Sequence, residues 1–283
     1  MKTTKLFSLL AAAGLTLGLA QSAQAYVLSW NYINEDGFTA WTPIAEIFTA
    51  DNSGGLRTLG PVNGTPTQLS WDGGAPGDQG GVHSDLTIGT GRSTGTVFTN
   101  GAWVNGVPLT HDNFAIPLGP HLDTATLEST LQLTALQAPG GSYAPLGDPI
   151  NFFINFTETP NDPGSGNLCA DGSPVGVGKN VNGCADILVL LNPGALNTVV
   201  FDSNGQMYHV AINPDSGGAF GTLSNAACTA AGAAAGCQGW ETVEGLSNTL
   251  QPQFSITVPE PATVGLLGLG LLGLGAMRRR KQA

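Results

Sequence analysis

Three polar side chains within four residues form the most distinctive internal string of the sequence. Thr110, His111 and Asn113 bring together a hydroxyl, an imidazole and an amide, which are groups that can hold a sugar or a metal ion. The same groups can also bond nearby backbone atoms and close a loop. A turn signal precedes them at Asn105-Gly106, and two prolines follow. We therefore expect these residues to brace a bent connection between two strands, with ligand binding and catalysis as the alternatives.

Other residues do not combine into a convincing catalytic site. Acidic residues are scattered along the chain, so no carboxylate pair for glycoside hydrolysis can be selected. The string Gly164-Ser165-Gly166 resembles a nucleophile elbow only superficially, because the second glycine is misplaced. We expect no catalytic residues and a protein that is not an enzyme.

Two short acidic strings offer oxygen ligands of the kind that calcium uses. They are Asp72 to Asp78 and Asp202 to Gly205. Neither completes a calcium loop that ends in a bidentate glutamate, so plain turns are the expectation and calcium is the alternative. We expect no other cofactor or metal.

The strand signals that must position these residues follow a period of two. In Asn151 to Thr157, apolar side chains alternate with polar ones, which is typical of a half-buried strand. Five further candidates are separated by turn clusters: 129–136, 187–191, 198–201, 207–212 and 254–258. Short strands at this spacing predict one all-β domain, an antiparallel sandwich or jelly-roll-like barrel with long Gly/Asn-rich loops.

Two glycine-rich segments are expected to lie outside the regular strands. Residues 51–91 contain three glycine pairs and predict long loops between short strands, although Leu69-Ser70-Trp71 within them suits a core. Residues 226–239, rich in alanine and glycine, are interpreted as a surface insertion.

The N-terminus has the parts of a secretory signal peptide in order. Two lysines precede an apolar stretch that runs from Leu6 to Ala20, and the small residues Ala23 and Ala25 then form a cleavage site. We expect cleavage after Ala25, which makes residues 1–25 a signal peptide and residues 26–257 the exported body.

The C-terminus, residues 258–283, contains similar parts in reverse order. Pro259, Glu260 and Pro261 precede a Gly/Leu-rich apolar stretch from Thr263 to Met277, and a basic cluster follows at Arg278, Arg279, Arg280 and Lys281. Fifteen helical residues span roughly 22 Å against a hydrocarbon core of about 30 Å, which is short for a permanent anchor. The basic cluster should stay cytoplasmic and leave the body outside. An ordinary short tail anchor is the alternative.

This terminal pattern resembles the PEP-CTERM sorting signal. The resemblance implies a precursor with a single C-terminal transmembrane helix, held transiently in the inner membrane and processed by exosortase, a membrane cysteine protease. It also implies a Gram-negative bacterium that makes exopolysaccharide, and a final location at the cell surface or in the extracellular matrix.

The internal string resembles the Thr-His-x-Asn signature of the THxN family of PEP-CTERM proteins. The similarity extends to Phe156 to Asn161 and to Cys184 to Val189, so it covers most of the body. Ala115 departs from the pattern, which has a proline before the isoleucine. The family has no established activity, so the resemblance implies location and context but no mechanism.

Four cysteines lie in the body, where an oxidising compartment favours disulfides. Sequence proximity favours Cys169 with Cys184 and Cys228 with Cys237. A four-thiolate zinc site is the alternative, but zinc frameworks usually contain close Cys-x-x-Cys pairs, and the sequence has none.

The body is strongly acidic. Residues 26–260 hold all 20 acidic residues and only three basic ones, Arg57, Arg92 and Lys179, which gives a net charge of −17. Such a surface repels phosphate backbones, so we expect no nucleic-acid partner and favour divalent cations or neutral and cationic polymers. The sequence thus predicts a structural or interaction protein of the cell surface or exopolysaccharide biofilm matrix. A carbohydrate-binding or carbohydrate-acting module that uses the Thr-His-x-Asn region is the alternative.

Overall fold

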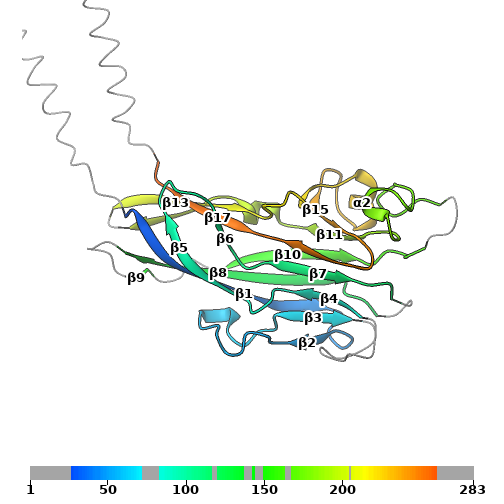
Figure 1. The fold of residues 1–283 in the computed structure, drawn as a ribbon, viewed down its shortest axis with the longest axis horizontal. Coiled ribbons are helices and arrows are strands. Elements are labelled where there is room, and N and C mark those ends of the chain that lie inside the picture. The colour runs from blue at the N-terminus through cyan, green and yellow to red at the C-terminus, as the bar shows by residue number, and fades with distance from the viewer. Residues whose placement is uncertain are drawn as a thin grey trace, which may run out of the picture.

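The protein forms an elongated body built almost entirely of antiparallel sheets (Figure 1). A computed structural model describes residues 27–71, 83–116, 120–136, 142–143, 149–162, 167–203 and 205–259. The predicted all-β, antiparallel class is therefore confirmed.

One large sheet runs the length of the body. Its two longest strands are β1 (Ser29–Thr42) and β8 (Thr124–Ala135), which pair with each other over nearly their whole length. The remaining members are β5 (Arg92–Phe98), β9 (Ser142–Tyr143), β10 (Ile150–Thr157), β11 (Asp186–Leu190), β15 (Gln238–Thr242) and β14 (Gly221–Thr222).

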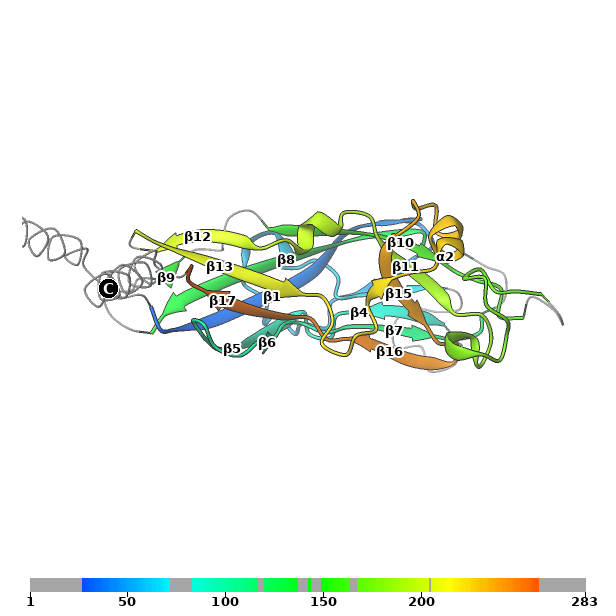
Figure 2. The same cartoon turned by 90° about the horizontal axis from the view of Figure 1, so that it is seen from above.

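Two smaller sheets cover one face of the large sheet, side by side along its length (Figure 2). The four-stranded sheet contains β12 (Val199–Ser203), β13 (Gln206–Asn213), β17 (Gln253–Thr257) and β6 (Val104–Asn105). The five-stranded sheet contains β16 (Leu246–Leu250), β7 (Leu109–Asn113), β4 (Ser84–Thr87), β3 (Gln68–Trp71) and β2 (Phe48–Ala50).

Each small sheet has its own apolar core against the large one. Under the four-stranded sheet, Trp30 is fully buried and meets Tyr208 edge to face, with ring centroids 5.1 Å apart. Under the five-stranded sheet, Trp71 meets Phe156 in the same manner at 5.0 Å. Trp71 belongs to the 51–91 segment, so the expectation that Leu69-Ser70-Trp71 suits a core agrees with the structure.

The predicted strands 151–157, 129–136, 187–191, 198–201, 207–212 and 254–258 correspond to β10, β8, β11, β12, β13 and β17. In β10 the alternation holds, because Ile154 and Phe156 are buried while Phe153 is exposed. The sequence analysis did not find β1, because the side chains at the middle of its inward face are the polar Asn34 and Asp36.

The segment 226–239 is not a mere surface insertion. Its α2 helix (Asn225–Ala230) starts at Ser224, whose Oγ accepts from the Ala227 amide at 3.0 Å. Ala227 packs on Ile187 and Val189 at the outer face of the large sheet. The segment then enters β15, where a Cβ on Gly239 would lie 2.1 Å from the Leu188 carbonyl oxygen. Small residues are thus needed for close packing there.

The two described chain ends leave the body at the same end (Figure 1). The Thr99 amide bonds the Leu28 carbonyl at 2.9 Å, and the Val258 amide bonds the Asn100 side chain at 3.1 Å. At the opposite end, which we call the distal end, lie α2 and the strand ends that meet at Thr42, Thr124 and Asn155.

Two arginines connect residues 51–59, the segment that follows β2, to strand β1. Arg92 pairs with the fully buried Glu35 at 3.0 Å, and the Leu59 amide donates to the same carboxylate at 2.6 Å. Arg57 is also buried, where it pairs with Asp51 at 3.0 Å and donates to the Asp36 carbonyl at 2.9 Å. Two of the three basic residues of the body are therefore engaged in this one anchor.

Some predicted features lie outside the described residues. These are the signal peptide with Ala23 and Ala25, and the tail from Glu260 through Pro261 to Arg278, Arg279 and Arg280. No helix within the described residues is long and apolar enough to cross a membrane. The predicted domain limits stay a prediction, although β17, the last described strand, ends at Thr257.

Both predicted disulfides are present. Cys169 bonds Cys184 and Cys228 bonds Cys237, across sequence separations of 15 and 9 residues. The zinc alternative is therefore excluded, since all four sulfur atoms are used.

Each disulfide should stabilise the fold by closing a short loop in the unfolded chain. Replacing Cys228 and Cys237 together with alanine should lower the free energy of unfolding by about 2–3 kcal/mol. Urea unfolding of the oxidised wild-type and double-variant proteins measures this difference. Equal unfolding free energies, or free thiols in the exported wild-type protein, would contradict the expectation.

Candidate functional site

The Thr-His-x-Asn string lies in a central strand, not in a bent connection. It forms most of β7, which pairs with β16 on one side and β4 on the other; His111 stands opposite Asn248 and Leu86. The expectation of a bent connection is therefore wrong. The strand could not be recognised from the sequence, because a histidine and an asparagine at its inward positions give no hydrophobic alternation.

His111 is a core residue. It is fully buried, lies 5.5 Å from Trp71 in a stacked arrangement, and meets Phe156 edge to face at 5.2 Å. Its Nδ1 shares a hydrogen bond of 2.8 Å with the Thr242 hydroxyl. Burial lowers the pKa of His111 from 6.5 to about 3, so the imidazole is neutral at physiological pH.

The other two residues of the string also bond protein groups. Thr110 shares a hydrogen bond of 2.9 Å with the Thr249 hydroxyl on the neighbouring strand β16. Asn113 is fully buried and donates through Nδ2 to the Thr242 carbonyl at 3.0 Å. The three side chains therefore brace β7 against β15 and β16, although Thr110 and His111 bond side-chain hydroxyls and not the backbone groups that we expected.

Three carboxylates that the sequence analysis did not single out lie at the distal end. We call Glu158, Asp186 and Glu244 the acid cluster; they stand at or just beyond the ends of β10, β11 and β15. Asp186 pairs directly with Thr242, so these two side chains share the inner face of the large sheet. Glu158 follows Phe156 at a period of two, and Glu244 follows Thr242 in the same way.

Two members of the acid cluster are deeply buried. Asp186 is fully buried and Glu244 is 3 % exposed. Burial raises the pKa of Asp186 well above its usual range, and the charges of Glu158 and Glu244 raise it further. Burial also raises the pKa of Glu244, although the adjacent Gly245 amide acts in the opposite direction. In the described part of the chain, no ion pair joins Asp186 or Glu244 to a basic side chain.

The three sequence strings that carry the THxN resemblance meet at this cluster. Asn113 comes from the first string, Glu158 and Asn161 from the second, and Asp186 from the third. Asn161 donates to the Ile116 carbonyl at 3.3 Å, which ties the second string to the end of the first. Sequence reasoning missed this convergence because it depends on the pairing of strands far apart in the chain.

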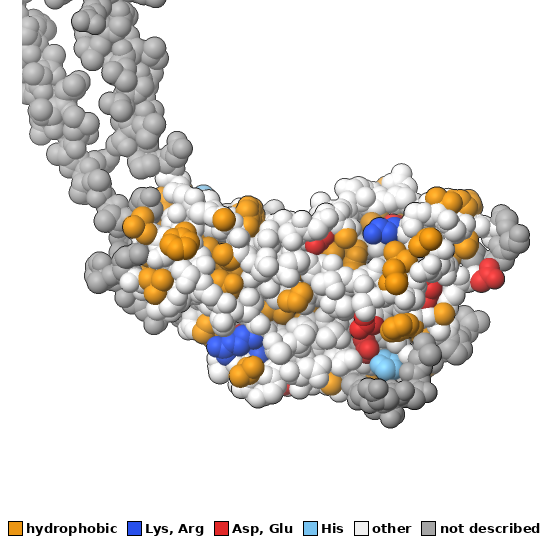
Figure 3. Space-filling model, viewed as in Figure 1, with side chains coloured by type: hydrophobic (Ala, Val, Ile, Leu, Met, Phe, Trp, Pro, Cys, Tyr) orange, Lys and Arg blue, Asp and Glu red, His pale blue; other side chains and the backbone are white. Residues whose placement is uncertain are grey.

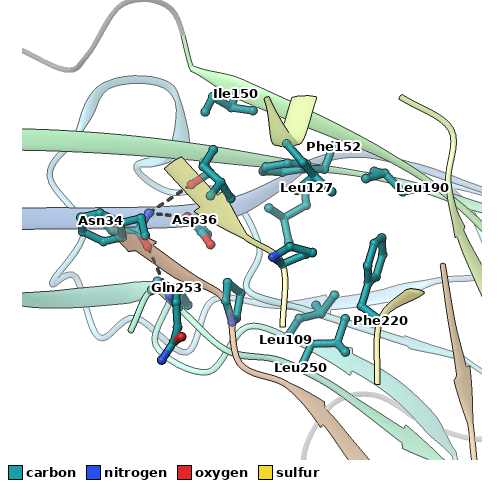
Figure 4. Close-up of a pocket in the computed structure, with 18 of the residues that line it drawn as sticks. Asn34, Asp36, Leu109, Leu127, Ile150, Phe152, Leu190, Phe220, Leu250 and Gln253 are labelled. Carbon is teal, nitrogen blue, oxygen red and sulfur yellow. Dashed lines mark hydrogen bonds between the residues drawn. The ribbon is translucent and has the colours of Figure 1, made fainter. Parts of the chain in front are cut away.

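A central cavity of about 170 Å³ lies where the two small sheets separate over the large one (Figure 4). Its walls are mostly apolar and include Leu127, Phe152, Leu190, Phe220 and Leu250. All three sheets contribute to this lining.

One end of the cavity is polar. There Asn34 donates to the Asp36 carboxylate at 2.9 Å and accepts from the Val107 amide at 3.2 Å (Figure 4). Burial raises the pKa of Asp36 from 3.8 to about 7, although hydrogen bonds from Ser129 and Asn34 oppose the shift.

The two acidic strings that were weighed as calcium sites have different outcomes. Residues 72–78 lie outside the described residues. Asp202 closes the turn between β12 and β13 by accepting from the Gly205 amide at 3.0 Å, as expected for a plain turn. In the described ranges, no three His, Cys, Asp or Glu side chains already stand together as a metal site.

His111→Ala should destabilise the protein without affecting surface association per folded molecule. Removing a buried ring between Trp71 and Phe156 leaves a cavity and should cost about 3 kcal/mol. Thr110→Ala, which removes only a hydroxyl at an exposed bond, is the matched control and should cost under about 1 kcal/mol. Thermal melts and retention at the cell surface measure both effects. An unshifted melt with abolished retention would instead identify His111 as a ligand-binding residue.

Asp36 should make the protein less stable as the pH rises from about 4 to 7. Over this range the native carboxyl keeps a proton that the unfolded chain releases, so the native state loses on the order of 4 kcal/mol relative to the unfolded state. Asp36→Asn should remove most of this decline, whereas Asp123→Asn, at an exposed carboxylate, should retain it. Urea unfolding across the pH range provides the measurement. Parallel wild-type and Asp36→Asn profiles would contradict the assignment.

Comparison with protein-family models gives a match at the C-terminus. Residues 257–281 match the family model described as the PEP-CTERM protein-sorting motif. No curated protein matches the chain. The match covers only this short stretch, so membership of the THxN family stays a prediction. The chain carries a PEP-CTERM protein-sorting motif that begins where the last strand of its β sandwich ends, and this motif marks it as an exported protein targeted to exosortase.

Proposed function

We propose that this protein is a non-enzymatic structural or interaction component of the cell surface or exopolysaccharide matrix. The observation that carries the proposal is the sorting motif at residues 257–281, which implies export and processing by exosortase. The motif begins at Thr257, the last residue of β17, so processing would release a complete sandwich.

The placement of the chain ends supports a surface role. Both described ends leave the body beside Thr99 and Asn100. A precursor held in the inner membrane by its tail would therefore present its distal end, with α2 and the two disulfides, away from the bilayer (Figure 1). Disulfides suit an oxidising compartment.

The charge of the body limits the choice of partner. Arg57 and Arg92 are engaged in the anchor to β1, which leaves Lys179 as the exposed basic residue among those of the body that the structure describes. Figure 3 shows a face on which uncharged groups predominate and basic side chains occupy only small areas. Neutral polymers, cationic polymers and divalent cations are therefore favoured over nucleic acid.

The carbohydrate alternative has less support. It relied on Thr110, His111 and Asn113, but His111 and Asn113 are fully buried and bonded to Thr242. A polysaccharide could not contact them without opening the sandwich. Specific sugar binding or turnover by the purified protein on a glycan array and in a hydrolase screen would reverse this preference.

The mature surface protein should lack Arg278 to Lys281. Exosortase processing removes the basic cluster and the apolar stretch, so intact-mass analysis of the surface fraction should find a chain that ends before residue 278. Full-length C-termini in the surface fraction of wild-type cells would contradict the proposal.

Replacing Pro259, Glu260 and Pro261 with alanine should trap the precursor in the inner membrane. The apolar stretch and basic cluster stay intact in this variant, so insertion continues while recognition by exosortase is lost. Fractionation followed by immunoblotting measures the distribution. Gln251→Ala, a substitution within the body, is the control and should reach the surface normally. Normal release of the triple variant would show that exosortase does not need Pro259, Glu260 and Pro261.

A further inference from the structure

We propose that Asp186 and Glu244 of the acid cluster, together with Asn113 and Asn161, bind one calcium ion inside the distal end of the sandwich. This site differs from the two acidic strings that the sequence suggested. It is buried, and it is assembled from four separate parts of the chain.

Five buried oxygen atoms of the described residues have no hydrogen-bond partner here, although the Gly245 amide acts electrostatically on the Glu244 carboxylate. They are Asn113 Oδ1, Asn161 Oδ1, Asp186 Oδ2 and both carboxylate oxygens of Glu244. Buried polar atoms in folded proteins are almost always paired, and leaving one unpaired costs about 1–3 kcal/mol. Five unpaired acceptors in one region therefore indicate a missing partner.

Asn113 and Asp186, which carry two of these atoms, face one interior space. Asn113 follows His111 at a period of two, so it points from the five-stranded sheet toward the large sheet. Asp186 shares the inner face of the large sheet with Thr242, to which Asn113 also bonds. Asn113 and Asp186 therefore approach the same residue from opposite sheets.

Glu244 and Asn161 are brought to this space by a close approach at Gly183. A Cβ on Gly183 would lie 2.7 Å from the Asn161 carbonyl oxygen and 3.2 Å from Glu244 Cγ. The backbone φ of Gly183 is +143°, which residues with a side chain rarely adopt. Glycine is therefore required both by the close contacts and by the backbone conformation. The Gly245 amide also bonds the Asn113 carbonyl at 2.7 Å, which places Glu244 beside the end of β7.

Asp186 and Glu244 have no basic partner among the described residues. The charged groups that act on Asp186 are Glu158 and Glu244, both acidic. His111, which bonds the same Thr242, is a neutral imidazole in this environment. Burying two carboxyl groups without a positive charge is costly, so a cation would supply the partner that Asp186 and Glu244 lack.

The donor set selects calcium among the common cations. All the candidate ligands are carboxylate or amide oxygens, without a thiolate or imidazole nitrogen that would favour zinc or copper. Calcium accepts six to eight oxygen ligands in flexible geometry, including a bidentate glutamate, and both oxygens of Glu244 are available. No three acidic side chains of the described residues form a metal site by themselves, so the amide oxygens of Asn113 and Asn161 would have to complete the ligand set.

Calcium should stabilise the exported wild-type protein directly. After chelation and dialysis at pH 7, calcium at about 100 times its dissociation constant should raise the melting temperature by about 5–10 °C. Isothermal titration calorimetry should give one ion per chain. Potassium at matched ionic strength should leave the melt unchanged, and magnesium should have a smaller effect than calcium.

Two variants separate a calcium ligand from a merely structural residue. Asp186→Asn and Glu244→Gln should each weaken calcium binding at least tenfold. Without calcium, Asp186→Asn should melt at or above the wild-type temperature because it removes a carboxyl group whose ionisation is penalised by burial; with calcium it should melt below. Glu241→Gln is the matched control, because Glu241 lies on β15 but faces away from the cluster, and its calcium response should equal that of the wild type.

The wild-type titration decides the proposal even if a variant fails to fold. The absence of a calcium shift beyond the potassium control would overturn it. An unchanged calcium response in Asp186→Asn would also overturn it, and an equal shift with magnesium would overturn the assignment to calcium.

Discussion

The burial of carboxylates without basic partners is the constraint on which this structure depends. Residues 26–260 contain three basic residues and twenty acidic ones, and Arg57 and Arg92 are engaged in the anchor near Glu35. Glu35 is buried and paired, whereas Asp186 and Glu244 are buried with no basic side chain on them in the described part of the chain. The distal end therefore needs either protons or a metal cation. A bound calcium ion would neutralise these buried carboxylates and would link the two layers of the sandwich.

The arrangement of the three sheets determines where polar groups lie inside the sandwich. The large sheet presents one continuous inner face, but two separate sheets cover it, each over its own apolar core. Where they part, the inner face of β1 carries Asn34 and Asp36, and the central cavity opens. At the distal end, His111, Asn113 and the acid cluster occupy the interior in place of apolar side chains. Polar groups are thus found inside where apolar packing from the small sheets is interrupted.

Local pattern predicted much of this fold. The alternation in β10 identified a half-buried strand, sequence proximity identified both disulfides, and the order of residues in the tail identified the sorting motif. Features set by distant pairing were not predicted. Asn113 and Asp186 are 73 residues apart, and in the sequence each resembles an ordinary turn or strand-end residue. Only the packing of β7 over β11 brings them together. Strand β1 was missed for a related reason, since its central inward residues are polar and give no hydrophobic period.

The proposed surface role and the proposed calcium site are connected by location, since the site lies at the end of the body opposite the one where β17 ends. The most direct test of the account is a crystal structure of the exported protein grown with calcium, with anomalous scattering used to locate the ion. The account predicts one ion between β7 and β11, bound by Asn113, Asp186 and Glu244. Water molecules alone at this place, or carboxyl groups hydrogen-bonded to one another with no ion between them, would contradict it.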